Sequence, residues 1–181
     1  MTGKEWEHAI EAMLRAVPGA WPCRYEPKMQ AGYRVDGGTP DFGIWVAPTY
    51  HLIECKLSSK GWMPLAKTEK GGDGVSPAQA ETMDAAERAG IRCWVAARLE
   101  LSEAQYRKLS QQTITGVGGD VPRAVQQLVP WSVWGDWMRR AEGQRLRGEP
   151  VQASIPAADL VRLGYPLRHV GELVVALRSD P

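Results

Sequence analysis

Residues 41–57, DFGIWVAPTYHLIECKL, are the stretch of sequence that decides the fold. The segments DFGIWVA (41–47) and YHLIECKL (50–57) are rich in residues that favour β-strands. Between them, Pro48-Thr49 is a connection short enough for a tight turn. We therefore expect the two segments to form a β-hairpin.

The second predicted strand has two chemically different faces, because successive side chains point to opposite sides of a strand. Ile53, Cys55 and Leu57 share one face, which is apolar and is expected to lie in the core. The opposite face carries Glu54 and Lys56, which puts a carboxylate and an ammonium group side by side. This pair indicates either a solvated sheet face or a reactive site.

Asp41 opens the preceding strand, and a staggered hairpin would bring its carboxylate near Glu54. Mg²⁺ takes oxygen ligands and prefers one or two carboxylates together with water and phosphate. We expect Asp41, Glu54 and the backbone carbonyl of Cys55 to supply such ligands, although Asp41 could instead cap the start of its strand. Lys56 could orient or deprotonate an attacking water, or stabilise developing charge. This set of residues favours phosphodiester hydrolysis.

A helix is expected on each side of the hairpin in the sequence. Residues 3–16 place apolar side chains on one stripe, and Glu7 lies at the border of that stripe, where a carboxylate can face a cleft. Glu7 could therefore complete the metal site. A second helix is expected to run from Ser76 to about Ala89, where Gln79 completes a capping-box pattern with Ser76.

At this point the residues resemble a known family. Thr39-Pro40-Asp41 followed by Ile53-Glu54-Cys55-Lys56 resembles the signature of the PD-(D/E)XK nucleases. With Glu7 upstream and Ser76-Pro77-Ala78-Gln79 downstream, the order is similar to archaeal and phage Holliday-junction resolvases and to virus-type replication-repair nucleases. The resemblance covers roughly residues 3–98.

The resemblance implies a restriction-endonuclease-like core with the element order αβββαβ. It also implies Mg²⁺-dependent cleavage of DNA, with Mn²⁺ as a substitute, and a place for Gln79 close to the active site. The predicted substrate is branched DNA, above all a four-way junction. Two paired cuts in a junction would be made by a homodimer with two active sites.

The order of elements expected from the residues themselves is α, β, β, β, α, β, α, which is an α/β class with a mixed sheet. We expect a nuclease core over residues 1–115 and a mainly helical C-terminal extension over 116–181 that serves as a dimerisation or DNA-binding arm. The remaining predictions are an edge strand at 23–30, a loop at 58–75, a strand at 91–97, helices at 101–112 and 131–147, a short helix at 156–164 and a further strand or helix at 170–177.

The overall charge gives no argument for nucleic acid, because 22 Lys and Arg oppose 21 Asp and Glu. Contacts to DNA phosphates must come from local clusters. One cluster is the loop with Lys60, Lys67 and Lys70, and another is the segment with Arg139, Arg140, Arg145 and Arg147. A solvated helix face explains the arginine segment equally well. Trp131, Trp134 and Trp137 are spaced for helix packing or a dimer seam rather than for stacking on bases.

Several classes of site are disfavoured. Cys23, Cys55 and Cys93 are far apart and form no C-x-x-C, so we expect buried or half-buried free thiols rather than a disulfide framework or a zinc site. His8 and His51 are expected to be surface or packing residues. The sequence has neither a membrane-spanning apolar run nor a signal-peptide core at its N-terminus, which predicts a cytoplasmic location in a bacterial or phage-infected host cell.

Three alternative functions stay open on the sequence. The first is a repair, replication or restriction nuclease that acts on flaps, ends or duplex DNA. The second is a non-catalytic module that binds nucleic acid, which the intact set of Asp41, Glu54 and Lys56 disfavours. The third is a binding protein that does not contact nucleic acid.

Overall fold

A six-stranded sheet forms the centre of the computed structural model, which describes residues 1–25, 29–30, 33–34, 38–67, 73–107 and 123–179. The strands lie in the order β1-β4-β5-β7-β8-β10. β5 and β7 run parallel, whereas their other neighbours run antiparallel, so the sheet is mixed as predicted. The bounds are Ala20–Arg24 for β1, Phe42–Val46 for β4, Thr49–Ser58 for β5, Arg92–Glu100 for β7, Ala124–Pro130 for β8 and Tyr165–Pro166 for β10.

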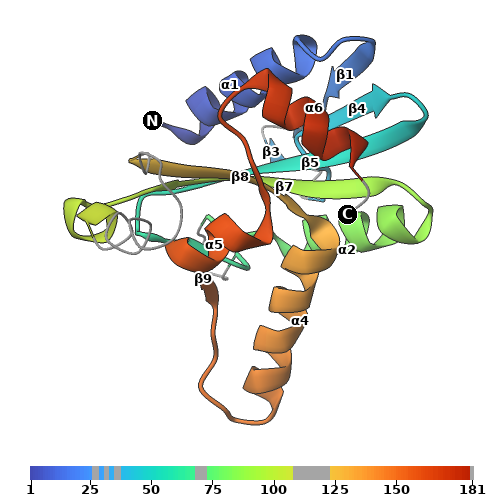
Figure 1. Ribbon diagram of the computed structural model, residues 1–181. Helices are drawn as coiled ribbons and strands as arrows, with labels where there is room; N and C mark the ends of the chain where they lie inside the picture. The colour runs from blue at the N-terminus through green and yellow to red at the C-terminus, as the bar shows by residue number, and fades with distance from the viewer. Residues whose placement is uncertain (26–28, 31–32, 35–37, 68–72, 108–122, 180–181) are drawn as a thin grey trace.

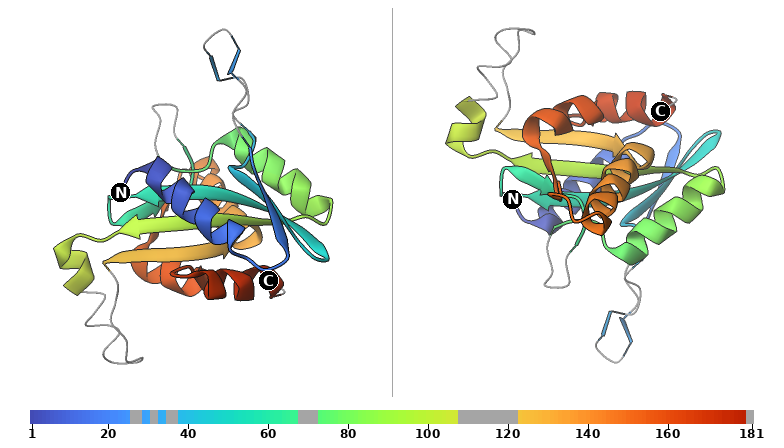
Figure 2. Two further views of the ribbon diagram at one scale, coloured as in Figure 1. Left: turned by 90° about the horizontal axis from the view of Figure 1, so that it is seen from above. Right: turned by 90° about the horizontal axis from the view of Figure 1, so that it is seen from below.

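Helices cover both faces of this sheet (Figure 1). α1 (Gly3–Arg15) and α6 (Val170–Arg178) lie on one face. α2 (Pro77–Arg88) and α4 (Trp131–Leu146) lie on the other face, and Figure 2 shows them from below. The short helix α5 (Ala157–Leu163) packs near β8. Residues 103–107 are helical after Ser102, whereas 108–112 of the predicted helix lie outside the described residues.

Each face of the sheet has its own hydrophobic core. On the α1 face, Trp6 and Ile10 pack with Phe42 and Ile53. The indole of Trp6 also donates a 2.9 Å hydrogen bond to the carbonyl of Ala96 in β7, which fixes α1 over the sheet. Burial of each such large side chain contributes about 1.5–3 kcal/mol, so the position of α1 is firmly determined.

On the opposite face of the sheet, side chains of β5 and β7 are buried under α2 and α4. Leu52 and Val95 pack there with Met83 of α2 and with Trp131 and Trp134 of α4. The indole of Trp134 donates to the carbonyl of Leu65, at 3.2 Å. Trp131 and Trp134 therefore serve helix packing, one of the two roles predicted for the tryptophans of this helix.

Two short two-stranded sheets are separate from the central sheet. β2 (Met29–Gln30) pairs with β3 (Tyr33–Arg34), and β6 (Trp62–Pro64) pairs with β9 (Ser154–Pro156). The prediction of a loop throughout 58–75 is therefore wrong at β6. β6 is ordered by a partner strand far along the chain, which a local pattern cannot reveal.

The predicted edge strand also starts in a different place. β1 begins at Ala20, opposite Val46 of β4, rather than at residue 23. β8 was not predicted at all, and it continues the central sheet beyond β7. The C-terminal region thus supplies both strands and helices to the same layered structure.

With the strands of the two short sheets left out, the elements α1, β1, β4, β5, α2 and β7 follow the predicted αβββαβ order. The predicted fold class, α/β with a mixed sheet, is confirmed. None of the helices in the described parts of the chain combines the length and apolar character needed to cross a membrane.

Candidate active site

The site forms where β5 extends beyond its partner β4. The pairing with β4 ends at Ile53, whereas the pairing with β7 continues to Ser58. Asp41, which precedes β4, lies at this open edge and accepts a 2.7 Å hydrogen bond from the backbone N–H of Cys55 through Oδ2. Because the N–H and C=O of one strand residue point to the same side, the carbonyl of Cys55 faces the same edge.

Glu54 is the most buried charged residue of the site, with 1% of its surface exposed. Its Oε1 lies 2.5 Å from Lys56 Nζ and accepts a 2.6 Å hydrogen bond from Gln79 Nε2. No hydrogen-bond partner among the described residues reaches its buried Oε2. Burial raises the pKa of Glu54 to about 7, with a further rise from Asp41, and the ion pair with Lys56 only partly opposes it.

Gln79 connects the helix cap to this carboxylate. Its Oε1 accepts the backbone N–H of Ser76 at 3.0 Å, and its own backbone N–H donates to Ser76 Oγ at 3.2 Å, which completes the capping box. Lys56 Nζ also donates to Gln79 Oε1, at 3.4 Å. Gln79 therefore has both of the positions predicted from the sequence: it caps the helix and it lies at the site.

Glu7 reaches the site from α1. Its carboxylate is paired with Arg24 of β1, with 2.8 Å between Oε2 and Nη2. Arg24 also binds Glu11 at 3.1 Å, and Glu11 binds Arg15 at 2.7 Å, so Glu7 belongs to a chain of ion pairs along the helix. Arg24 was not among the residues predicted for the site.

These side chains meet in one pocket of about 350 Å³. Its lining comprises Gly3, Glu7, Asp41, Glu54, Cys55, Lys56, Leu57, Lys67, Asp73, Gly74, Ser76 and Gln79. All five residues predicted as catalytic are therefore brought together, while their roles stay predictions. Asp73 is an acid that the sequence analysis missed, because it follows a glycine-rich stretch with no periodic pattern.

The pocket contains few groups that could bind a metal ion. Among the residues that the structure describes, no group of three or more His, Cys, Asp or Glu side chains could hold a metal ion. What the pocket offers is Asp41, Glu54 and the carbonyl of Cys55, with Glu7 held to Arg24 alongside. Two carboxylates suit Mg²⁺, which keeps several of its waters when bound. The buried Oε2 of Glu54 is an acceptor that a cation would satisfy.

The predicted DNA contacts are spread over two places. Lys67 lines the pocket, Lys60 lies 3.7 Å from Asp73, and Lys70 lies outside the described residues. On and just after α4, three arginines are paired with acids and the fourth lies over a ring: Arg139 with Asp84 and Asp136, Arg145 with Glu142, Arg147 with Glu149, and Arg140 over Trp137. Contacts of these residues with DNA stay a prediction.

The residues predicted to have no chemical role pack as follows. His51 is buried, and its Nδ1 accepts a 3.0 Å hydrogen bond from the indole of Trp94. Burial lowers the pKa of His51 to about 4, so it is neutral at pH 7. The three cysteines are free thiols, as predicted. Cys23 is exposed rather than buried, because it lies on the edge strand β1.

Comparisons with known proteins give matches among solved structures. No protein-family model matches the sequence, and no curated protein sequence is significantly similar to it. Among solved structures, Hjc from Archaeoglobus fulgidus, a Holliday junction resolvase from an archaeal hyperthermophile, matches 72% of this chain and 78% of its own, with 17% identity and a TM-score of 0.43.

Proposed function

We propose that this chain is a metal-dependent DNA endonuclease that hydrolyses phosphodiester bonds. The observation that carries the proposal is the buried carboxylate of Glu54, which is paired with Lys56 and lines the same pocket as Asp41. A buried carboxylate that is ionised needs partners for both oxygens, and Oε2 has none among the described residues. Strongly shifted acids in a pocket are typical of functional sites.

Asp41 and Glu54 would hold Mg²⁺ or Mn²⁺ together with the carbonyl of Cys55, and Glu7 would assist from α1. When bound, such an ion polarises a phosphate oxygen and lowers the pKa of its water. The donor set is all oxygen, which is the preference of these hard cations.

The side chains of the pocket have distinct tasks in this proposal. Lys56 Nζ orients the attacking water and stabilises charge that develops on the phosphate oxygens. Glu54 holds Lys56 in place through the 2.5 Å contact with Nζ. Gln79 fixes Oε1 of Glu54, and the backbone of Cys55 fixes Asp41. The groups are thus positioned before a substrate arrives, which is what rate acceleration by positioning requires.

The proposed substrate is branched DNA, with the four-way junction first. The resemblance of the sequence motifs to junction resolvases supports this choice, and a two-fold homodimer would place two such pockets for paired cuts. Lys60, Lys67 and the arginines of α4 would contact phosphates. Binding should therefore weaken steeply as salt is raised.

The decisive experiment is Mg²⁺-dependent cleavage of a labelled four-way junction beside a flap and a linear duplex, with Glu54→Gln as the control. Symmetric nicks in the junction that the variant does not make would support a resolvase, and light scattering of the complex should then report a dimer. Cleavage of flaps or duplex would keep the nuclease and change its substrate. Salt-dependent binding without cleavage of any DNA would instead indicate a non-catalytic module.

A further inference from the structure

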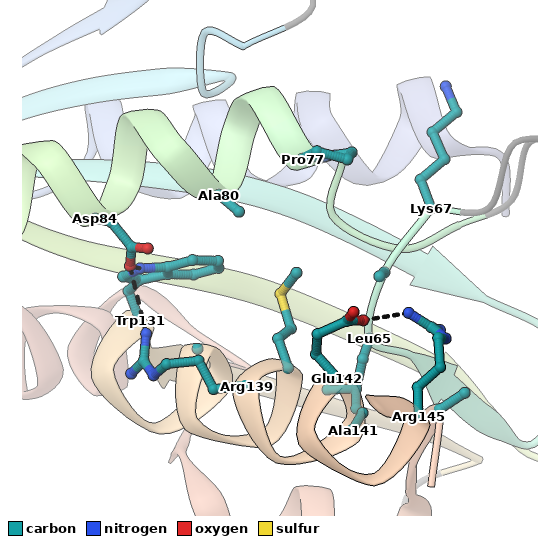
Figure 3. Close-up of a pocket in the computed structure, with 14 residues that line it drawn as sticks. Leu65, Lys67, Pro77, Ala80, Asp84, Trp131, Arg139, Ala141, Glu142 and Arg145 are labelled. Atoms are coloured by element: carbon teal, nitrogen blue, oxygen red, sulfur yellow. Dashed lines mark hydrogen bonds and ion pairs between the residues drawn. The ribbon is translucent and has the colours of Figure 1, made fainter. Parts of the chain in front are cut away.

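A second and larger cavity lies next to the candidate active site, between α2, α4 and the segment 65–67 (Figure 3). Its volume is about 880 Å³, within the range of about 300–1,000 Å³ that is common for small-molecule sites. Apolar side chains line it from three elements: Leu65 beside β6, Ala80 of α2, and Trp131, Met138 and Ala141 of α4. No pattern in the sequence indicates this cavity.

Polar groups of both signs line the same cavity. Arg139 lies 3.6 Å from Asp84, and Arg145 pairs with Glu142, as the dashed lines in Figure 3 show. Asp84 Oδ1 also accepts a 2.7 Å hydrogen bond from the indole of Trp131. The side chains of Arg139 and Arg145 are more than half exposed, so they can exchange these partners for a ligand.

Lys67 joins this cavity to the active-site pocket, because it lines both. Its backbone is held in place: its N–H donates to the carbonyl of Val75 at 2.8 Å. Gly74 allows this close approach, since a Cβ there would lie 2.3 Å from the carbonyl carbon of Ala66. The start of α2 separates the two spaces, with Pro77 lining the second cavity and Gln79 lining the first.

The composition of the cavity fits a nucleobase. Apolar surface accepts the flat face of a nucleobase, and arginine and carboxylate groups hydrogen-bond the edges of bases. Lys67 adds a cation for the phosphate between the two spaces. A base that is paired and stacked in duplex cannot enter such a cavity, because it must first leave the helix.

We propose that this cavity binds an unpaired nucleotide of the DNA strand next to the bond that is cut. The inference rests on the proposed nuclease function and deepens it, because it makes unpaired DNA at the branch the preferred substrate. It also gives Arg139 and Arg145 a task that differs from general phosphate contact. Arg140 and Arg147 do not line the cavity and take no part in this selection.

The test compares two four-way junctions with the same arms, one fully paired and one with two unpaired thymidines at the branch. The wild-type protein should cut the second junction faster. Ala80→Trp fills the cavity from a half-buried position on α2, and it should remove this preference, lowering kcat/KM for the unpaired junction about fivefold or more. The matched control is Ala85→Trp, on the same helix but exposed and outside the cavity. Thermal melting checks that both variants fold.

Arg139→Ala tests the same cavity without adding bulk, and its control is Arg88→Ala, at an exposed position of α2 outside the cavity. An equal loss on both junctions, or no loss, would overturn the proposal. If the wild-type protein cuts no DNA, the nuclease function fails, and binding of oligothymidylate by fluorescence still decides the inference. Binding that Ala80→Trp removes would support the cavity as a nucleotide site. Absent binding, or binding that survives in Ala80→Trp, would refute it and leave the cavity for a protein partner.

Discussion

Replacing Glu54 by glutamine should make the metal-free protein more stable at high pH and abolish cleavage. Burial raises the pKa of Glu54 from the ordinary 4.5 to about 7. A group whose pKa is raised on folding contributes stability that is fully present below its unfolded pKa and is lost as the pH rises through its folded pKa. The wild-type protein should therefore lose stability between about pH 4.5 and pH 7, whereas Glu54→Gln has no such ionisation.

The magnitude follows from the size of this pKa change. Each tenfold change in an equilibrium constant corresponds to about 1.4 kcal/mol, so the full effect is about 3–4 kcal/mol, most of which falls between pH 5 and pH 8. In a chain of 181 residues, a change of that size shifts Tm by roughly 5–10 °C. The pKa of about 7 already includes the opposing effect of the ion pair with Lys56, so no separate free energy is added for that pair.

The assay is thermal or urea denaturation of both proteins in EDTA from pH 5 to pH 8. The two should be similar in stability near pH 5, where Glu54 is protonated and resembles glutamine in shape. As the pH rises, the free energy of unfolding of the wild-type protein should fall below that of the variant. Parallel curves across this range would refute the reasoning, because they would show that Glu54 ionises as easily in the folded as in the unfolded chain.

Mg²⁺ should act through the same carboxylates: at pH 8 it should raise the Tm of the wild-type protein but not that of Asp41→Asn, and an equal rise in both would exclude Asp41 as a ligand. Lys56→Ala should slow cleavage by about 10²-fold or more while gel-shift affinity for DNA changes little, and normal cleavage by this variant would remove Lys56 from the mechanism. Gln79→Glu keeps a residue that suits the capping box but places a second carboxylate beside Glu54, so the acidic limb of the pH–rate profile should move to higher pH. An unchanged profile would show that Gln79 serves the cap alone.

The parts of the fold that the sequence revealed are those fixed by local chemistry. The hairpin over 41–57 was visible because its strands are β-prone and its turn is short, and the faces of β5 followed from simple alternation. The capping box of Ser76 and Gln79 was visible for the same reason, since both partners lie within one turn of helix. These local features also brought Asp41, Glu54 and Lys56 together.

The parts that were missed depend on partners far along the chain. β6 is short and acquires its strand geometry from β9, and β8 contains Gln126 and Gln127, which have no strong preference for a strand. The ion pair between Glu7 and Arg24 joins α1 to β1 through packing that no local pattern encodes. The cavity beside α4 is likewise a product of three elements that meet only in the folded chain.

The choice of glutamine at position 79 illustrates how the local and distant constraints combine. A capping box accepts glutamate or glutamine equally, because either supplies the oxygen that binds the N–H of residue 76. Only the amide also has a donor on its other end, and here Nε2 donates to Glu54 at 2.6 Å. A glutamate would turn a second negative charge toward that buried carboxylate. The helix cap permits either residue, and the charge of Glu54 decides between them, so the start of α2 and the active site constrain each other.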